Sequence, residues 1–185
     1  MAMVNRINEV FLFIGKLGTG KTTRALLLAK AMKKKIIIYD QIDHPAMSNI
    51  QIVNDEQLKR FNGEICRYIG HLETFVDLML KYQSNAVVLF EDSSRYISSN
   101  LEKFMKSFIV EHRKVNFDLI FMFHFLSDVP PYMCKQYSKM FLFKTGDNPE
   151  VKQPKFANWH KILEKLKKVL SHKQFNHFEI ITLNE

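Results

Sequence analysis

The fold is decided near the start of the chain by the stretch Gly15-Lys16-Leu17-Gly18-Thr19-Gly20-Lys21-Thr22. It matches the pattern G-x-x-x-x-G-K-[ST] at every position, and the pattern is informative when a strand precedes it and a helix follows it. The flanking sequence meets both conditions, because Val10 to Ile14 is a short apolar run and Thr22 to Lys34 has helical character. The stretch therefore predicts a glycine-rich loop between a buried strand and a helix.

Each part of this loop suits the binding of a polyphosphate. Glycines let the backbone curl with its N–H groups inward, and the helix presents its unpaired N–H groups and positive end to the same anion. We expect Lys21 to contact the β- and γ-phosphates and the Thr22 hydroxyl to bind Mg²⁺. The expected ligands are ATP and Mg²⁺, and the alternative is a glycine turn that matches by chance. The predicted nucleotide-binding residues are Gly15, Lys16, Leu17, Gly18, Thr19, Gly20, Lys21, Thr22 and Thr23.

The bulk composition is that of one globular domain. With 185 residues, 46% of them hydrophobic and 25% charged, the chain can bury a core, and this composition argues against global disorder. No apolar run is long enough to cross a bilayer, and the first residues contain no secretory signal. Cys66 and Cys134 lie far apart, outside metal-ligand spacing, so we expect buried thiols in a reducing cytoplasm. The expected location is cytoplasmic, or the host cytoplasm or virion if the chain has a viral or mobile-element origin.

The net charge of +8 favours an anionic partner. Nucleic acid and a polyphosphate ligand fit this charge equally, and scattered surface lysines are the simpler alternative. Clustered lysines near the C-terminus could neutralise DNA phosphates, but they could also form the solvated face of an amphipathic helix. These lysines are Lys161, Lys165, Lys167 and Lys168.

Continuous apolar runs recur along the chain and predict buried strands. They are Val10 to Ile14, Ile36 to Tyr39, Ala86 to Phe90, Leu119 to Phe123 and Met140 to Phe143. Strands without alternation are typical of parallel sheets that helices cover on both faces. The predicted fold is therefore α/β, a three-layer P-loop NTPase with a mainly parallel sheet.

Helices are predicted between these strands. Phe75, Leu78, Met79 and Tyr82 have helical spacing, and Ser99 with Glu102 forms a capping-box pattern that opens another helix, with Leu101 on its apolar face. The polar segment from Gln41 to Asn62 is expected to be irregular, and Glu64 to Ile69 is a further candidate strand.

The character of the sequence changes after Lys144. A turn pattern at Gly146 to Pro149 precedes an amphipathic helix that contains Trp159, and Phe178 to Leu183 is a predicted strand. We therefore divide the chain into a P-loop ATPase core, residues 1–148, and a C-terminal helix–strand extension packed on it, residues 149–185.

Two acids follow the apolar strand from Ala86 to Phe90. In nucleotide hydrolases of this type, a strand-end acid holds Mg²⁺ and a neighbouring acid polarises the attacking water. By position, Glu91 would take the metal role beside Thr22, and Asp92 would be the catalytic base. The usual order is Asp then Glu, so the inverted order is compatible with a slow or inactive enzyme. The alternative is a pair of exposed strand-end acids without a role.

Other polar residues stand where ligands of α/β sheets bind. His124 follows a buried strand, where it could contact the γ-phosphate or the attacking water, although a core histidine would look the same. Asp40 holds a comparable position. Arg113 is a candidate for completing a neighbouring subunit's site, or is simply a cation at a helix C-terminus, and Arg95 is a second candidate.

The order of these pieces resembles a known family. After the loop at Gly15 come Ile37-Ile38-Tyr39-Asp40, Glu91-Asp92, Glu111-His112-Arg113-Lys114-Val115-Asn116-Phe117, Leu119 to His124, and Leu126-Ser127-Asp128-Val129-Pro130. This order is similar to that of the FtsK–HerA superfamily of DNA-pumping ATPases. Its compact members include viral genome-packaging ATPases and the cytoplasmic part of zonula-occludens-toxin-like phage assembly proteins. The resemblance covers roughly Val10 to Lys144. His124 stands where such proteins often carry glutamine.

The resemblance implies an ATP-hydrolysing motor that translocates or packages DNA. It implies a ring, expected to be a hexamer, with ATP sites between subunits and DNA in a central channel. The predicted catalytic residues are then Lys21, Glu91, Asp92, His124 and, in trans, Arg113.

Two alternatives remain from the residues alone. One is a small nucleotide or nucleoside kinase, although Lys144 to Asn158 lacks the arginines of a kinase lid. The other is a non-hydrolysing, ATP-dependent assembly switch.

Overall fold

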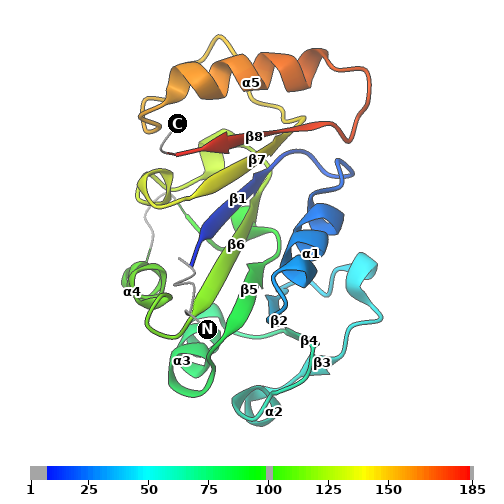
Figure 1. Ribbon diagram of the computed structural model, residues 1–185, viewed down its shortest axis with the longest axis vertical. Coiled ribbons are helices and arrows are strands. Elements are labelled where there is room, and N and C mark those ends of the chain that lie inside the picture. Colours follow the sequence, from blue (N-terminus) through cyan, green and yellow to red (C-terminus); the bar gives the residue numbers. More distant parts are fainter. Residues whose placement is uncertain (1–7, 99–101, 184–185) are drawn as a thin grey trace, which may run out of the picture.

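The computed structural model describes residues 8–98 and 102–183, and it contains one eight-stranded sheet (Figure 1). The strand order is β3-β4-β2-β5-β6-β1-β7-β8, and every pair is parallel except β7 with β8. The predicted α/β fold with a mainly parallel sheet is confirmed. The strands are β1 Val10–Ile14, β2 Lys35–Tyr39, β3 Ile52–Val53, β4 Ile65–Tyr68, β5 Ala86–Phe90, β6 Phe117–Phe123, β7 Lys139–Phe143 and β8 Phe178–Thr182.

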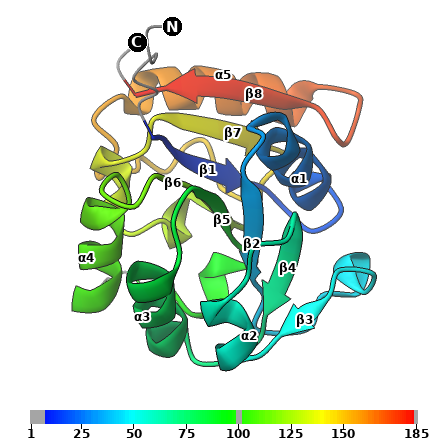
Figure 2. The same cartoon turned by 60° about the horizontal axis from the view of Figure 1, so that its bottom comes forward.

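Helices cover both faces of this sheet (Figure 2). The continuous apolar strands, in which polar residues do not alternate with apolar ones, predict this arrangement. One core cluster lies between the sheet and α3, α4 and α5, and a second lies between the sheet and α1. The α-helices are α1 Lys21–Ala31, α2 Asp55–Lys59, α3 Leu72–Tyr82, α4 Lys103–Glu111 and α5 Trp159–Ser171. Short 3-10 helices are η1 Pro45–Met47, η2 Ser93–Arg95, η3 Leu126–Asp128 and η4 Met133–Lys135.

Alternation along each strand explains the two clusters. In β1, Phe11 and Phe13 belong to the cluster under α1, whereas Leu12 and Ile14 belong to the cluster on the opposite face. Successive side chains of a strand point to opposite faces, so a continuous apolar run supplies both cores at once. Between β5 and β6, the rings of Phe90 and Phe121 stack with centroids 4.6 Å apart.

The prediction of an irregular segment from Gln41 to Asn62 is wrong in part. The segment contains η1, the two-residue strand β3 and the five-residue helix α2. Asn54 caps α2, accepting a hydrogen bond from the Gln57 N–H in a capping box. A strand of two residues is too short to produce a pattern, and its pairing with β4 is a tertiary contact.

Two helix boundaries also differ from the sequence pattern. The first helix ends at Ala31, and Lys33 has a left-handed backbone with φ 55°, which stops the helix before Lys34. The helix α4 begins at Lys103 with Glu102 at its N-cap, without a side-chain cap. Ser99 of the predicted capping box and Leu101 lie outside the described residues.

Beyond β7, the chain remains attached to the same sheet. The strand β8 pairs antiparallel with β7, and α5 packs on both strands through Ile162 and Leu166. The division into residues 1–148 and 149–185 stays a prediction. Within the described residues, none of the helices combines the length and apolar character needed to cross a membrane.

The parallel strands bring the candidate site together. The carboxyl ends of β1, β2, β5, β6 and β7 lie at one edge of the sheet, because these strands all point the same way. The glycine loop, Asp40, Glu91, His124 and Lys144 follow these strands directly. We refer to this as the carboxyl edge of the sheet, and to the opposite side as the amino edge.

Candidate functional site

The glycine loop leaves β1 between two neighbouring strand ends. The Gly15 N–H donates to the carbonyl of Phe123 at 3.1 Å, and the Lys16 N–H donates to that of Lys144 at 2.8 Å. Gly18 and Gly20 have φ angles of 79° and 86°, which glycine adopts without a steric penalty. These constraints curl the loop over the start of α1, as the sequence predicts.

Lys21 lies inside this curl. Its Nζ donates to the carbonyls of Gly15 at 2.5 Å and Lys16 at 3.0 Å, and the residue is 8% exposed. Burial lowers the pKa of Lys21, while the charges of Glu91 and Asp92 oppose that shift. A phosphate anion held by the loop would stabilise the charged ammonium further.

The Thr22 hydroxyl reaches the first strand-end acid, donating to Oε1 of Glu91 at 3.2 Å. Burial raises the pKa of Glu91 to about 7, against the opposing effects of this hydrogen bond and of Lys21. The nearby Asp40 and Asp92 raise the pKa of Glu91 further. The positive charge around Glu91 is therefore too small to keep its buried carboxyl group ionised as readily as in water. Glu91 stands at the position where the sequence predicts the metal.

These two oxygen donors fit magnesium. Among the described residues, no group of three or more His, Cys, Asp or Glu side chains could hold a metal ion by itself. Mg²⁺ is commonly held by one or two protein oxygens together with phosphate oxygens and water. Thr22 and Glu91 form such a partial site, and a divalent cation there would favour the ionised carboxylate.

Asp92 and His124 are brought together, although they are separate candidates in the sequence. Asp92 has a left-handed backbone, with φ 48° and ψ 48°. One oxygen of its carboxylate, Oδ2, accepts a hydrogen bond from Nε of Arg95. The other, Oδ1, lies 2.8 Å from Nε2 of His124, a close contact without hydrogen-bond alignment. The second acid is therefore held between a cation and a half-buried imidazole.

Several residues that the sequence analysis missed hold the surrounding loops. The His124 N–H donates to Oγ of Ser94 at 3.0 Å, and the Ser94 hydroxyl donates to Oδ2 of Asp128 at 2.8 Å. Asp147 accepts from the Leu126 N–H at 2.8 Å. These contacts join residues at least 21 positions apart. No local pattern could have indicated them.

Asp40 is engaged by the protein itself. Its Oδ2 accepts from Nη1 of Arg67 at 3.0 Å and from the His44 N–H at 2.8 Å, and both charged side chains are almost completely buried. Sequence analysis missed Arg67, because a cation inside a strand has no distinctive spacing. Asp40 acts on the site through its charge next to Glu91.

Arg113 lies away from the glycine loop of its own chain. It is exposed on the turn between α4 and β6, at the amino edge. The seven residues of β6 separate that turn from His124. Such a strand spans roughly 20 Å. Arg95, in contrast, stands at the carboxyl edge beside Asp92.

The remaining loop residues are placed for access from solvent. Lys16, Leu17, Gly18 and Thr23 are exposed, and Gly20 is half-buried. Thr19 is buried, and its hydroxyl donates to the Lys16 carbonyl at 2.7 Å. Residues 16–18 of the loop are therefore open to solvent, while Thr19 and Lys21 face the protein.

A family model described as zonular occludens toxin (Zot) matches residues 9–180 of the sequence. The chain belongs to the Zot family. This match confirms the resemblance to zonula-occludens-toxin-like ATPases, and it extends past Lys144 into α5 and β8. A search of curated protein sequences finds no match for this Zot-family chain.

Solved structures share the fold of this Zot-family chain. The genome packaging NTPase B204 from Sulfolobus turreted icosahedral virus 2, in complex with ATP-gammaS, superposes with a TM-score of 0.72 at 17% identity, covering 96% of this chain and 93% of that one. The same protein in complex with sulfate gives 0.73 at 16% identity, covering 97% and 93%. The N-terminal domain of zonular occludens toxin from Neisseria meningitidis gives 0.51 at 12% identity, covering 76% and 79%.

Proposed function

We propose that this Zot-family chain is an ATP-hydrolysing P-loop enzyme and an oligomeric motor that translocates or packages DNA. The observation that carries the enzymatic part is the contact between Thr22 and Glu91, 69 residues apart, beside the buried Lys21. It joins a phosphate-binding loop to a strand-end acid in the arrangement that phosphoryl transfer requires. The B204 packaging NTPase, which has the same fold, was solved with ATP-gammaS, and this supports ATP as the ligand.

The residues of the site have distinct roles in this proposal. The loop N–H groups and Lys21 bind and orient the triphosphate, so that most of the catalysis is positioning and charge stabilisation. Thr22 and Glu91 would hold Mg²⁺, which neutralises charge on the β- and γ-phosphates when bound. Asp92 would orient the attacking water and accept its proton, with the imidazole of His124 beside its carboxylate.

His124 supports Asp92 in this role. With Nε2 at 2.8 Å from Oδ1, it can hold the carboxylate in place or sense the γ-phosphate beside it. The inverted order of the acids is thereby accommodated, because the longer Glu91 reaches Thr22 from a buried position. The shorter Asp92 stays at the strand end, and hydrolysis remains compatible with this geometry.

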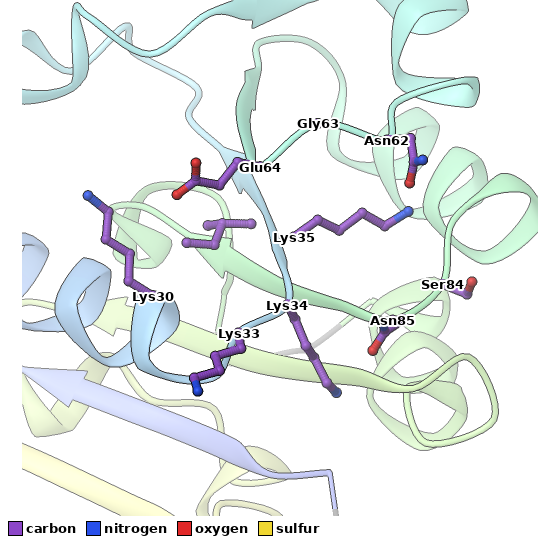
Figure 3. A pocket seen from close by; sticks show the side chains of 10 residues that line it. Lys30, Lys33, Lys34, Lys35, Asn62, Gly63, Glu64, Ser84 and Asn85 are labelled. Carbon is purple, nitrogen blue, oxygen red and sulfur yellow. The ribbon is translucent and has the colours of Figure 1, made fainter.

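A basic pocket at the amino edge favours nucleic acid as the partner. Lys30, Lys33, Lys34 and Lys35 line it together with Asn62 and Asn85 (Figure 3). Lys34 pairs with Asp118 and Lys35 donates to Gln83, whereas Lys30 and Lys33 are exposed. Exposed clustered cations with amide donors suit phosphodiester groups.

The lysines of α5 are less suited to that role. Lys165 pairs with Glu179 at 2.7 Å, and Lys168 pairs with Glu164 at 2.6 Å. These pairs neutralise part of the helix face, so the amphipathic-helix interpretation fits it better. We therefore assign DNA contact to the amino edge. For location we keep the cytoplasm, or the host cytoplasm or virion if the chain has a viral or mobile-element origin.

The experiment that tests this function measures ATP turnover with and without DNA, beside a panel of nucleoside acceptors. We expect Mg²⁺-dependent phosphate release that DNA stimulates several-fold and that Lys21→Ala abolishes. Phosphate transfer to an acceptor would establish the kinase alternative instead. Tight ATP binding without turnover would identify an assembly switch.

A mixing experiment tests the proposed oligomer. The position of Arg113 at the amino edge allows it to act only in a neighbouring subunit's site. Arg113→Ala and Lys21→Ala chains should each be inactive, and a mixture should recover part of the activity, because some interfaces then combine an intact loop with an intact arginine. Arg60→Ala, an exposed arginine near α2, is the matched control and should remain active. An active Arg113→Ala chain would assign this role to another residue, with Arg95 the next to test.

A further inference from the structure

We infer that the loop between α5 and β8, residues 172–177, is the nucleobase-binding wall of the nucleotide site, with the Phe175 ring as its stacking surface. This inference rests on the proposed function, because it concerns the same ligand. By this inference, the segment after residue 148 contributes residues to the nucleotide site itself.

The loop 172–177 lies beside the glycine loop in both views (Figures 1 and 2). A methyl carbon placed on Gly18 would come within 3.7 Å of Cε1 of Phe175, and one placed on Gly20 would come within 4.0 Å of Cβ of Asn176. The two loops thus lie close together, although more than 150 residues separate them in the sequence.

The sheet order indicates which part of the nucleotide faces this loop. β1, which carries the glycine loop, lies between β6 on one side and β7 with β8 on the other. Glu91 and Asp92 follow β5, on the β6 side, so the Mg²⁺-bound γ-phosphate end of the ligand points there. The nucleoside end therefore leaves the glycine loop toward β7 and β8, where the loop 172–177 stands.

The loop 172–177 is well braced from behind. The rings of His172 and His177 stack with centroids 3.8 Å apart, which closes the loop at its base. Phe178 packs on Phe143, with ring centroids 5.1 Å apart, and the guanidinium of Arg24 lies over the Phe178 ring, 5.2 Å from its centroid. Because both ends of the loop are held, its tip should lose little conformational entropy when it binds the ligand.

The tip has the chemistry of a base-binding surface. Phe175 is an aromatic side chain that remains 51% exposed, and its neighbour Asn176 is exposed and carries both donors and acceptors. An aromatic ring binds a base through its π face, and this accepts any base, whereas an amide can hydrogen-bond to a base edge. The expected ligand class is therefore a nucleoside triphosphate in which stacking supplies affinity and Asn176 supplies selectivity.

The test compares Mg²⁺-ATP with inorganic tripolyphosphate, which lacks the base, by calorimetric titration of the full chain. In Phe175→Ala the affinity for ATP should fall between about five- and about 150-fold, the range measured for loss of an aromatic stack. The affinity for tripolyphosphate should change less than twofold. Phe175→Tyr retains the ring and should bind ATP like the original chain.

Tyr82→Ala is the matched control, because Tyr82 is an aromatic of similar exposure, 53%, on α3. It should leave both affinities unchanged. Unchanged ATP binding by Phe175→Ala would overturn the inference, and so would equal affinity of the original chain for ATP and tripolyphosphate. Failure of the original chain to bind either ligand would instead overturn the proposed function. Thermal melting of each variant would exclude unfolding as the cause of a loss.

Discussion

At the scale of single residues, Glu91 is the side chain with the most unusual environment in the site. It is 5% exposed and accepts the Thr22 hydrogen bond, and burial raises its pKa to about 7 from 4.5. In the folded chain, the carboxyl group therefore keeps its proton to a higher pH than in the unfolded chain. Raised acid pKa values in a cleft are typical of functional sites, where a ligand supplies the missing positive charge.

The sign of the resulting pH dependence follows from linkage. Below about pH 4.5 both states hold the proton, and between about 4.5 and 7 only the folded state holds it. The free energy of unfolding must therefore fall across this window, by up to about 3 kcal/mol from Glu91 alone. Glu91→Gln removes this group, so in the absence of nucleotide the variant should be more stable than the original chain at pH 8 and equally stable near pH 4.5.

Urea unfolding at several pH values measures this difference. Glu73→Gln, an exposed acid on α3, is the matched control and should show no pH-dependent difference from the original chain. The Glu91→Gln variant should also lose Mg²⁺-dependent ATP turnover. A stability difference that does not vary with pH would contradict the assignment of a raised pKa to Glu91.

At the scale of elements, the contact between the glycine loop and β7 determines the shape of the phosphate site. Gly15 lies so close to β7 that a Cβ atom would stand 2.6 Å from Cβ of Phe143 and 3.1 Å from the Lys144 carbonyl. Real Cβ atoms essentially never come as close as 2.6 Å to another Cβ, so any side chain would push the loop away from β7. The glycine is required here by close packing, whereas Gly18 and Gly20 are required by their positive φ angles.

We therefore expect Gly15→Ala to lower both stability and ligand affinity. Overpacking of this kind costs about 1–3 kcal/mol of stability. Displacement of the loop should also weaken ATP binding, because its N–H groups would no longer all point at the bound phosphates. Gly63→Ala is the control, because the three atoms nearest to its added Cβ all belong to the side chain of Phe61 and not to the backbone. Chemical unfolding and ATP titration measure the two effects. A Gly15→Ala chain that folds and binds ATP normally would show that the loop can shift freely.

At the scale of the whole molecule, the parallel sheet separates two charged regions. The proposed nucleotide site occupies the carboxyl edge, and the lysine pocket occupies the amino edge beside the turn that carries Arg113. Because both regions lie on one rigid sheet, a motion at one edge can be transmitted to the other as a rigid-body rotation within an assembly. This arrangement suits a subunit that couples ATP turnover to movement of a polyanion.

The lysine pocket makes a further prediction possible. Lys30→Glu with Lys33→Glu should weaken DNA binding and flatten its dependence on salt concentration. The slope of log affinity against log salt should fall by about 0.9 for each lost phosphate contact. Affinity for ATP should not change, because these residues are far from the glycine loop.

Lys161→Glu with Lys167→Glu, on α5, carries the same change of charge and serves as the control. If DNA contacts the amino edge, this control should keep the original salt slope in a filter-binding or anisotropy titration. The opposite result, with loss of slope only in the α5 variant, would move the DNA contact to the C-terminal helix.

The glycine loop, the mainly parallel sheet and the two strand-end acids were all predictable from the sequence. The loop motif is local, because its glycines, Lys21 and Thr22 all lie within eight successive residues. The buried strands are equally local, because parallel strands covered on both faces need unbroken apolar runs. The short elements β3 and α2 were missed, because runs of two and five residues carry too little pattern.

Only the tertiary structure decided which of these pieces meet. The contact of Thr22 with Glu91, the approach of His124 to Asp92 and the position of Phe175 beside Gly18 depend on strand order. The tertiary structure also shows Arg113 at the opposite edge, away from the glycine loop of its own chain. Chemistry carried by consecutive residues is encoded locally, whereas contacts between distant residues follow from how the strands are ordered and which way each one points.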